Sequence, residues 1–269
     1  MIKRIKIWFV SIVVSLTSFH CSSLMHINVY PISKDIELGK EMDVEIRRDS
    51  KHYPLLIDRP DVKEYIERIG KKILASPDIV YRNQFAYQFE IIADDSTVNA
   101  FCTPGGYVYV YTGLLKFVDN EATLAGVLAH EIAHAEKRHS TNKMTTQNGL
   151  QTVIGLASGK LGGSGTQVAG AIAGLGLLKF NRTEEEEADT YSFKYLKSTE
   201  YYPGAIRFFF EKIGVNQKGS MFTQMLSTHP LPQDRFENVN NLLLEAGNPQ
   251  ANEANLFTEH YQKFKSTLP

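Results

Sequence analysis

The sequence of 269 residues is poor in several features that mark specialised classes of protein. Its 29 basic and 30 acidic residues leave a formal net charge of −1, so no basic excess is present to neutralise nucleic-acid phosphates. It has two cysteines, Cys21 and Cys102, and Cys102 has no disulfide partner if Cys21 is lipidated or removed with a leader. We therefore expect Cys102 to be a small buried apolar residue. The length of the chain, with its 43% hydrophobic residues, predicts one large domain or two small ones with a sizeable core.

The N-terminus has the pattern of an export signal. Basic residues at positions 3–6 precede an apolar run over residues 7–19, which is too short to span a bilayer comfortably. Cys21 follows at once, as in a bacterial lipoprotein signal, where the cysteine becomes the lipidated first residue. Phe19 and His20 are bulky where small residues are expected, so a plain cleaved signal and an uncleaved anchor stay open. We predict the periplasmic face of a membrane in the cell envelope, with an outer-membrane lipoprotein favoured over an inner-membrane anchored or secreted protein.

The remaining chain alternates between periodic apolar segments and turns. Helices are expected over residues 33–49, 58–75, 120–139, 182–198, 203–213 and a last stretch ending near residue 246, and strands over residues 85–93 and 107–111. Residues 149–178 are rich in Gly and Ala, and a buried helical hairpin, a mobile lid or a membrane-contacting segment would each fit. We expect a signal over residues 1–20, a tether over 21–32, a folded domain over 33–250 and a C-terminal tail over 251–269.

The pentapeptide HEIAH, residues 130–134, predicts a metal site. On a helix, His130 and His134 lie one above the other, so both imidazoles point to one spot, as two ligands of a tetrahedral zinc would. Glu131 is rotated by about 100° from His130, where it flanks the metal as a base acting on water rather than as a ligand. The neighbouring residues are uncharged, and it costs free energy to bury two histidines and a glutamate among them without partners. A purely structural role therefore explains these three residues poorly.

A catalytic zinc needs a third protein ligand, and RTEEEEADTY over residues 182–191 is the best source. With Glu185 set at 0° and about 100° per residue, Asp189 falls near 40° and Glu187 near 200°. The small and apolar residues of this helix gather on the side of Glu185, so Glu185 faces inward and needs a strong partner such as zinc. Asp189 is then placed to accept a hydrogen bond from a ligand imidazole.

The other acidic residues of this run carry no predicted metal chemistry. Glu187 is expected on the solvated surface, and Glu184 and Glu186 on the flanks of the helix. His139, five residues past His134, lies off the face that His134 shares with His130, so we expect it to have a structural role or to lie behind a ligand.

These motifs together resemble the M48 family of zinc metallopeptidases, in particular its bacterial periplasmic and mitochondrial branch. HEIAH is followed by NRTEEEEAD, which is similar to the family pattern R-x-x-E-x-E-A-D, with Arg182 setting the register and Glu185 at the ligand position. NAFCTPGGYVYVYTGLL over residues 99–115 and the STHP stretch over residues 227–230, with Arg235 after it, extend the resemblance across roughly residues 90 to 240.

The resemblance implies a zincin-like α+β domain, mostly helical, with a small antiparallel or mixed sheet whose edge strand borders a zinc cleft. It implies one Zn²⁺ per chain, held by His130, His134 and Glu185, with Glu131 as the catalytic base. Arg182 is expected to pack or pair behind the ligands. His229 resembles a histidine that approaches the zinc and either blocks it or steadies the transition state.

The resemblance also implies how a substrate would bind. Gly106, Tyr107, Val108 and Tyr109 resemble the edge strand that pairs with an extended polypeptide by β-augmentation.

The sequence thus predicts a zinc metalloendopeptidase that is attached to a membrane through Cys21 and has no nucleic-acid partner. The resemblance to the family further implies that its substrates are unfolded or misassembled envelope proteins. Two alternatives stay open. A zinc-stabilised, chaperone-like lipoprotein would bind unfolded chains with little or no cleavage. A plain envelope structural protein with an accidental motif would bind no stoichiometric metal.

Overall fold

The computed structural model describes residues 28–146, 179–216, 220–230 and 233–269. The chain divides into two compact units, one made of residues 1–31 and 141–162 and the other of residues 32–140 and 163–269. Within the first unit, the Asn28 side-chain amide donates a hydrogen bond of 2.8 Å to the Thr141 hydroxyl. The expected signal, the lipidated Cys21 and the Gly-rich segment 149–178 lie outside the described residues. In the part of the chain that is described, none of the helices is long and apolar enough to cross a membrane.

The second unit contains a small three-stranded sheet. Its strands are β1 (Gln88–Ile92), β2 (Ala100–Thr103) and β3 (Tyr107–Tyr111), in the order β1-β3-β2. β1 runs parallel to β3, and β2 runs antiparallel to it with Cys102 opposite Val108. The short turn η2 (Pro104–Gly106) joins β2 to β3, and its Gly105 and Gly106 have φ angles of 74° and 89°, which favour glycine.

This order corrects the expected substrate strand. Tyr107, Val108 and Tyr109 lie in the central strand, whose two sides are both paired, so they cannot accept a further strand. Gly106 lies in the turn, where an added Cβ would come within 2.9 Å of the Tyr87 ring. The strand that borders the candidate site is instead β2, an edge strand.

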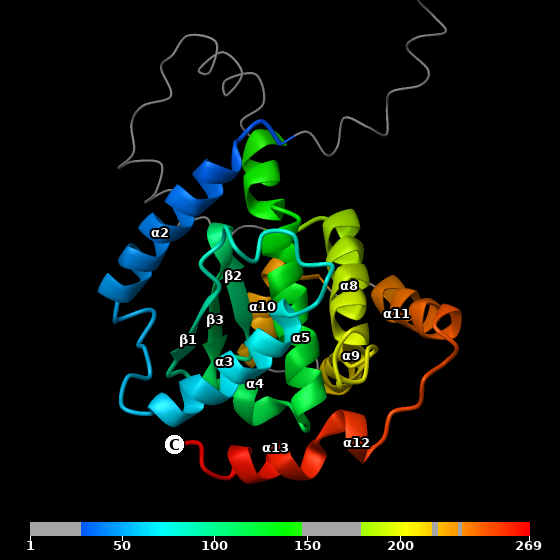
Figure 1. Cartoon of the computed structure of the whole chain (residues 1–269). Helices are drawn as coiled ribbons and strands as arrows, with labels where there is room; N and C mark the ends of the chain where they lie inside the picture. Colours follow the sequence, from blue (N-terminus) through cyan, green and yellow to red (C-terminus); the bar gives the residue numbers. More distant parts are fainter. Residues whose placement is uncertain (1–27, 147–178, 217–219, 231–232) are drawn as a thin grey trace, which may run out of the picture. The chain divides into compact units, whose positions relative to one another are not determined.

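Helix α5 (Glu121–Glu136) runs between the sheet and helix α8 (Arg182–Lys197), as Figure 1 shows. Every residue of α5 is buried, which explains why most of its residues are apolar, and its three glutamates, Glu121, Glu131 and Glu136, are buried as well. Asn120 caps the start of the helix, since its side chain accepts a hydrogen bond of 2.8 Å from the Thr123 amide. Gly126 lets the next helix approach closely, because an added Cβ would lie 2.7 Å from the backbone nitrogen of Ile206.

The other helices surround this centre. They are α2 (Ile32–Arg48), α3 (Pro60–Leu74), α4 (Thr112–Phe117), α9 (Ile206–Asn216), α10 (Thr223–Thr228), α11 (Gln233–Glu245), α12 (Glu253–Leu256) and α13 (Thr258–Lys265). The mostly helical α+β class with a small mixed sheet is confirmed. Cys102 is free and buried, as expected.

The C-terminal residues, expected as a tail, are folded onto the domain. Tyr261 of α13 is fully buried and donates a hydrogen bond of 2.7 Å to the Leu115 carbonyl. Glu121, the first residue of α5, is 1% exposed and accepts hydrogen bonds from Arg68 and Tyr201, and it lies 2.8 Å from the His260 ring. The apolar residues that α13 buries explain why this segment does not extend into solvent.

Candidate metal centre

The two histidines of HEIAH face each other inside the protein. His130 and His134 are 4% and 2% exposed, and their Nε2 atoms lie 3.0 Å apart. One helical turn separates them on α5, as the i, i+4 spacing predicts. The Phe180 ring stacks on His134 at 4.0 Å between ring centroids and closes one side of the site.

Helix α8 brings Glu185 to the same spot. Glu185 is fully buried, and its two carboxylate oxygens lie 3.5 Å from His130 Nε2 and 3.5 Å from His134 Nε2. Ligand atoms at the corners of a tetrahedron with metal–ligand bonds of 2.0–2.1 Å lie about 3.3 Å apart. The 3.0 Å between the two Nε2 atoms and the 3.5 Å from each Nε2 to one of the Glu185 oxygens are close to this value, so the donor set is compatible with a tetrahedral metal ion.

The charges of the site also favour a cation. Glu131, Glu185 and Asp189 are at most 4% exposed, and the buried charge that faces them among the described residues is the guanidinium of Arg235, 2% exposed. Burial lowers the pKa of His130, but its hydrogen bonds to Asp189 and Glu185 outweigh burial and raise the pKa to about 9. The site therefore attracts positive charge, which a divalent ion would supply.

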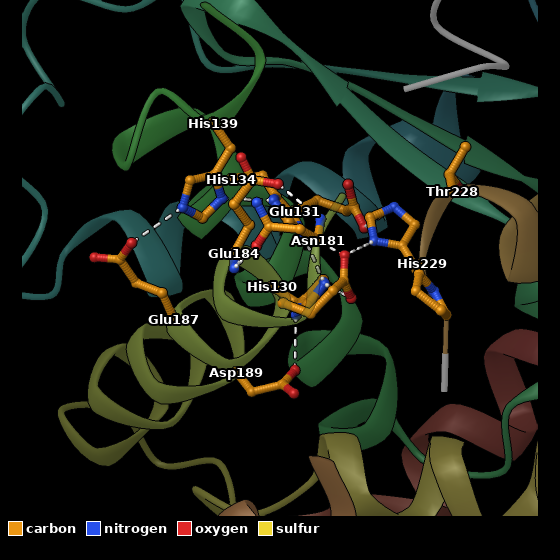
Figure 2. A network of polar contacts seen from close by, with 12 residues as sticks. His130, Glu131, His134, His139, Asn181, Glu184, Glu187, Asp189, Thr228 and His229 are labelled. Carbon is orange, nitrogen blue, oxygen red and sulfur yellow. Dashed lines mark hydrogen bonds and ion pairs between the residues drawn. The ribbon is translucent and has the colours of Figure 1, made fainter. Parts of the chain in front are cut away.

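Asp189 lies behind His130, on the side away from Glu185. Its Oδ1 is 2.9 Å from His130 Nδ1, the contact that Figure 2 draws as a dashed line. Arg235 of α11 holds the same carboxylate through Nε and Nη2, both at 2.7 Å, and reaches Glu185 Oε2 at 2.5 Å through Nη1. Burial raises the pKa of Asp189, but Arg235 outweighs burial and lowers it, so the carboxylate stays charged.

His139 and Glu187 lie behind His134. The Nδ1 atoms of His134 and His139 are 2.8 Å apart, and His139 Nε2 is 3.2 Å from Glu187 Oε2. The expectation that Glu187 lies on the solvated surface is wrong, because its side chain is only 26% exposed and also pairs with Lys137 at 3.0 Å. The helical wheel of α8 placed Glu187 opposite Glu185 but could not show that the chain after α5 turns back to meet it.

Glu131 lies on the open side of the cluster together with His229. Glu131 is 4% exposed, and burial raises its pKa, which suits a base that must hold a proton during part of a reaction. His229 follows α10 directly, with Nε2 3.7 Å from Glu131 Oε1 and Nδ1 2.9 Å from Glu185 Oε1. His130, His134, Glu185 and His229 each offer one ligand atom, and these atoms lie within 4.8 Å of one another.

Two adjoining hollows reach this site, and both contain Glu131 and His229. One includes the edge strand β2 and aromatic side chains, and is lined by Tyr53, Asn99, Phe101, Cys102, Ser140, Phe180, Gln224 and Thr228. The other is mainly apolar beside His130 and Arg235, and its remaining lining residues are Asn99, Ala100, Val127, Ile206, Phe209, Phe210 and Met225. The two hollows meet beside Glu131 and His229, which line both of them.

The remaining residues of the glutamate run have separate tasks. Glu184 completes a capping box with Asn181, since the Asn181 side chain accepts from the Glu184 amide at 3.0 Å and Glu184 Oε2 accepts from the Asn181 amide at 2.7 Å. The N-x-x-E spacing before the helix was a signal for this. Arg182 does not lie behind the ligands as expected, because it is 63% exposed and pairs with Glu186 and Asp234.

Arg235 holds the position that was expected for Arg182. The sequence offered only its place after STHP, and nothing local to it indicated a buried guanidinium that contacts both Glu185 and Asp189.

The comparisons with known proteins agree with this geometry. The sequence model of Peptidase family M48 matches residues 60–243. The beta-barrel assembly-enhancing protease of Yersinia pestis is 30% identical over 223 residues, which cover 78% of this chain and 44% of that protein. The corresponding protein of Escherichia coli strain K12 is 30% identical over 220 residues, covering 77% and 44%. The mitochondrial metalloendopeptidase OMA1 of Schizosaccharomyces pombe is 32% identical over 185 residues, covering 68% and 53%. The chain thus spans about half the length of these relatives.

Proposed function

Because this chain belongs to peptidase family M48, we propose that it is a zinc-dependent endopeptidase whose metal is held by His130, His134 and Glu185. The observation that carries the proposal is the convergence of these three donors, at separations of 3.0 and 3.5 Å, beside the buried carboxylate of Glu131. A zinc ion there would polarise the scissile carbonyl and lower the pKa of a water molecule.

The residues of the chain divide the remaining work. Glu131 takes a proton from the attacking water and delivers it to the leaving amine, a transfer that its burial favours by raising its pKa. Asp189 and Arg235 orient His130. His229 lies within reach of both Glu131 and Glu185. It either binds the metal as a further ligand or donates a hydrogen bond to the developing oxyanion.

We propose that the substrate binds as an extended polypeptide along β2. This strand is paired on one side only, and its Phe101 and Cys102 line the hollow that contains Glu131. Main-chain pairing would give affinity for many sequences, as β-augmentation does elsewhere. The names of the two bacterial relatives support misassembled envelope proteins as the substrate class, and the N-terminal pattern supports attachment through Cys21 to the periplasmic face of a membrane.

The test compares wild type with Glu131→Gln on an unfolded polypeptide substrate. Loss of the base should reduce the cleavage rate by about 10²- to 10⁴-fold while zinc stays bound. Glu185→Gln should instead lose the metal, and a chelator should abolish cleavage in wild type until zinc is restored. Metal analysis of the purified protein should give one zinc per chain.

The variant His229→Ala distinguishes the two roles that the sequence left open for His229. If His229 blocks the metal by binding it, removal of His229 should raise the cleavage rate. If His229 donates a hydrogen bond to the oxyanion, the cleavage rate should fall. Equal absence of cleavage in wild type, Glu131→Gln and His229→Ala, with zinc bound in all three, would refute the peptidase and favour the chaperone-like alternative.

A further inference from the structure

His134, unlike His130, has a second histidine behind it. His139 is 2% exposed and both of its ring nitrogens are engaged, Nδ1 with His134 Nδ1 at 2.8 Å and Nε2 with Glu187 Oε2 at 3.2 Å. Glu187 is in turn fixed by Lys137 at 3.0 Å, and the Lys137 ammonium lies 3.9 Å from the centroid of the Tyr191 ring. A continuous line of polar contacts therefore runs from a proposed metal ligand to a half-buried carboxylate.

A turn of the backbone after α5 places His139 beside His134. On a continued helix, His139 would lie about 140° around the axis from His134, facing away from the metal. Helix α5 instead ends at Glu136, and Arg138 adopts the left-handed conformation with φ of 56°, which few residues without special reason adopt. An ion pair of 2.6 Å between Arg138 and Asp35 of α2 holds this turn.

The hydrogen positions along this line follow from the metal ligand. If His134 binds metal through Nε2, its Nδ1 carries the hydrogen and donates it to His139 Nδ1. His139 then carries its own hydrogen on Nε2 and donates it to the Glu187 carboxylate, which accepts. Each ring nitrogen in the line is then either a donor or an acceptor. Because the Glu187 carboxylate can only accept, it fixes the tautomer of both rings.

We propose that His139 and Glu187 are positioning residues for the metal, which hold His134 in the orientation and tautomer that leave Nε2 free to bind. The inference rests on the zinc site proposed above. Glu187 thereby does for His134, through an intervening imidazole, what Asp189 does for His130 by direct contact.

The experiment measures the zinc dissociation constant by competition with a chelator, so that it does not depend on peptidase activity. Glu187→Ala should weaken zinc binding on the order of tenfold, since loss of a partner behind a ligand typically costs 10- to 100-fold. Glu187→Gln, which keeps an acceptor for His139 without the charge, should fall between wild type and Glu187→Ala. Glu186→Ala is the matched control, because Glu186 is the neighbouring carboxylate and pairs only with the exposed Arg182 among the contacts described.

A second measurement distinguishes positioning from a structural role. Zinc-free Glu187→Ala should unfold at nearly the temperature of zinc-free wild type, and its Co²⁺-substituted form should show altered ligand-field absorption bands. If Glu187→Ala binds zinc as tightly as wild type and Glu186→Ala, the inference is wrong even if wild type cleaves its substrate. If wild type binds no zinc, the inference fails together with the proposed function. If only the stability of the zinc-free protein falls, the role of Glu187 is structural.

Discussion

The two histidines of HEIAH are equivalent in the sequence but are held in different ways in the fold. His130 is backed directly by Asp189, a buried carboxylate that is fixed by the buried guanidinium of Arg235. His134 is backed by His139, which passes the contact to the half-buried pair of Glu187 and Lys137. One side of the proposed metal site is therefore supported by a desolvated ion pair, and the support on the other side ends near solvent. The two sides should therefore contribute differently to folding and to metal binding.

The largest expected effect comes from breaking the buried side. Arg235→Met leaves Asp189 and Glu185 without their cation, and removal of one partner of a buried ion pair typically destabilises a protein by about 3–5 kcal/mol. Chemical denaturation of the zinc-free protein would measure this loss. Arg182→Met is the matched control, since its pairs are exposed to solvent and should contribute little to stability. Similar losses in both variants would contradict the distinction between the two arginines.

Asp189→Asn should weaken zinc binding more than Glu187→Ala does. It removes the charged acceptor that contacts His130 directly, so we expect a loss towards the upper end of the 10- to 100-fold range, against roughly tenfold for Glu187→Ala. Chelator competition on the two proteins, prepared side by side, gives the comparison. A larger loss in Glu187→Ala would reverse the order of the two sides.

The double variant Asp189→Asn/Glu187→Ala shows whether the two sides act independently. The two carboxylates contact different imidazoles, so their free energies of zinc binding should add to within about 0.5 kcal/mol. In dissociation constants, the two single effects should multiply to within about a factor of two. A much smaller loss in the double variant would mean that either change alone already releases the metal ligands from their shared geometry.

The smallest effect is expected at the solvent end of the longer side. Lys137→Met removes a pair whose two side chains are each 26% exposed, so it should alter zinc binding by less than about 1 kcal/mol. Zinc titrations at low and high salt would check it, because salt should reduce the difference between wild type and Lys137→Met. A difference that does not respond to salt would show that Lys137 acts by packing on Tyr191 instead.

Local pattern was enough to predict which side chains come together as proposed ligands, but not what surrounds them. The i, i+4 spacing of His130 and His134 and the inward side of α8 are properties of single helices, and the structure brings these residues together as expected. Arg235 lies 46 residues from Asp189 in sequence, and no local periodicity relates the two. The contact of Glu187 depends on the left-handed turn at Arg138, and Arg gives no sign of such a turn in the sequence.

The sheet shows the same division between local and distant information. A β-branched and aromatic run indicated the strand over residues 107–111, whereas β2 was not predicted. Which strand lies at the edge is decided by β1, whose parallel pairing with β3 spans a longer connection. No pattern within β3 distinguishes a central strand from an edge strand here, so the predicted substrate-binding residues were placed one strand too far from the site.

The contacts of Glu121 have a consequence for the time at which the metal site is completed. This first residue of α5 is held by Arg68, by Tyr201 and by His260, which lie before, after and far beyond it in the chain. A chain made from its N-terminus has synthesised HEIAH and all three proposed zinc ligands long before His260 and the buried Tyr261 emerge. The start of α5 thus gains its last anchor only when α13 has been made, after Arg68 and Tyr201 are already available to hold Glu121.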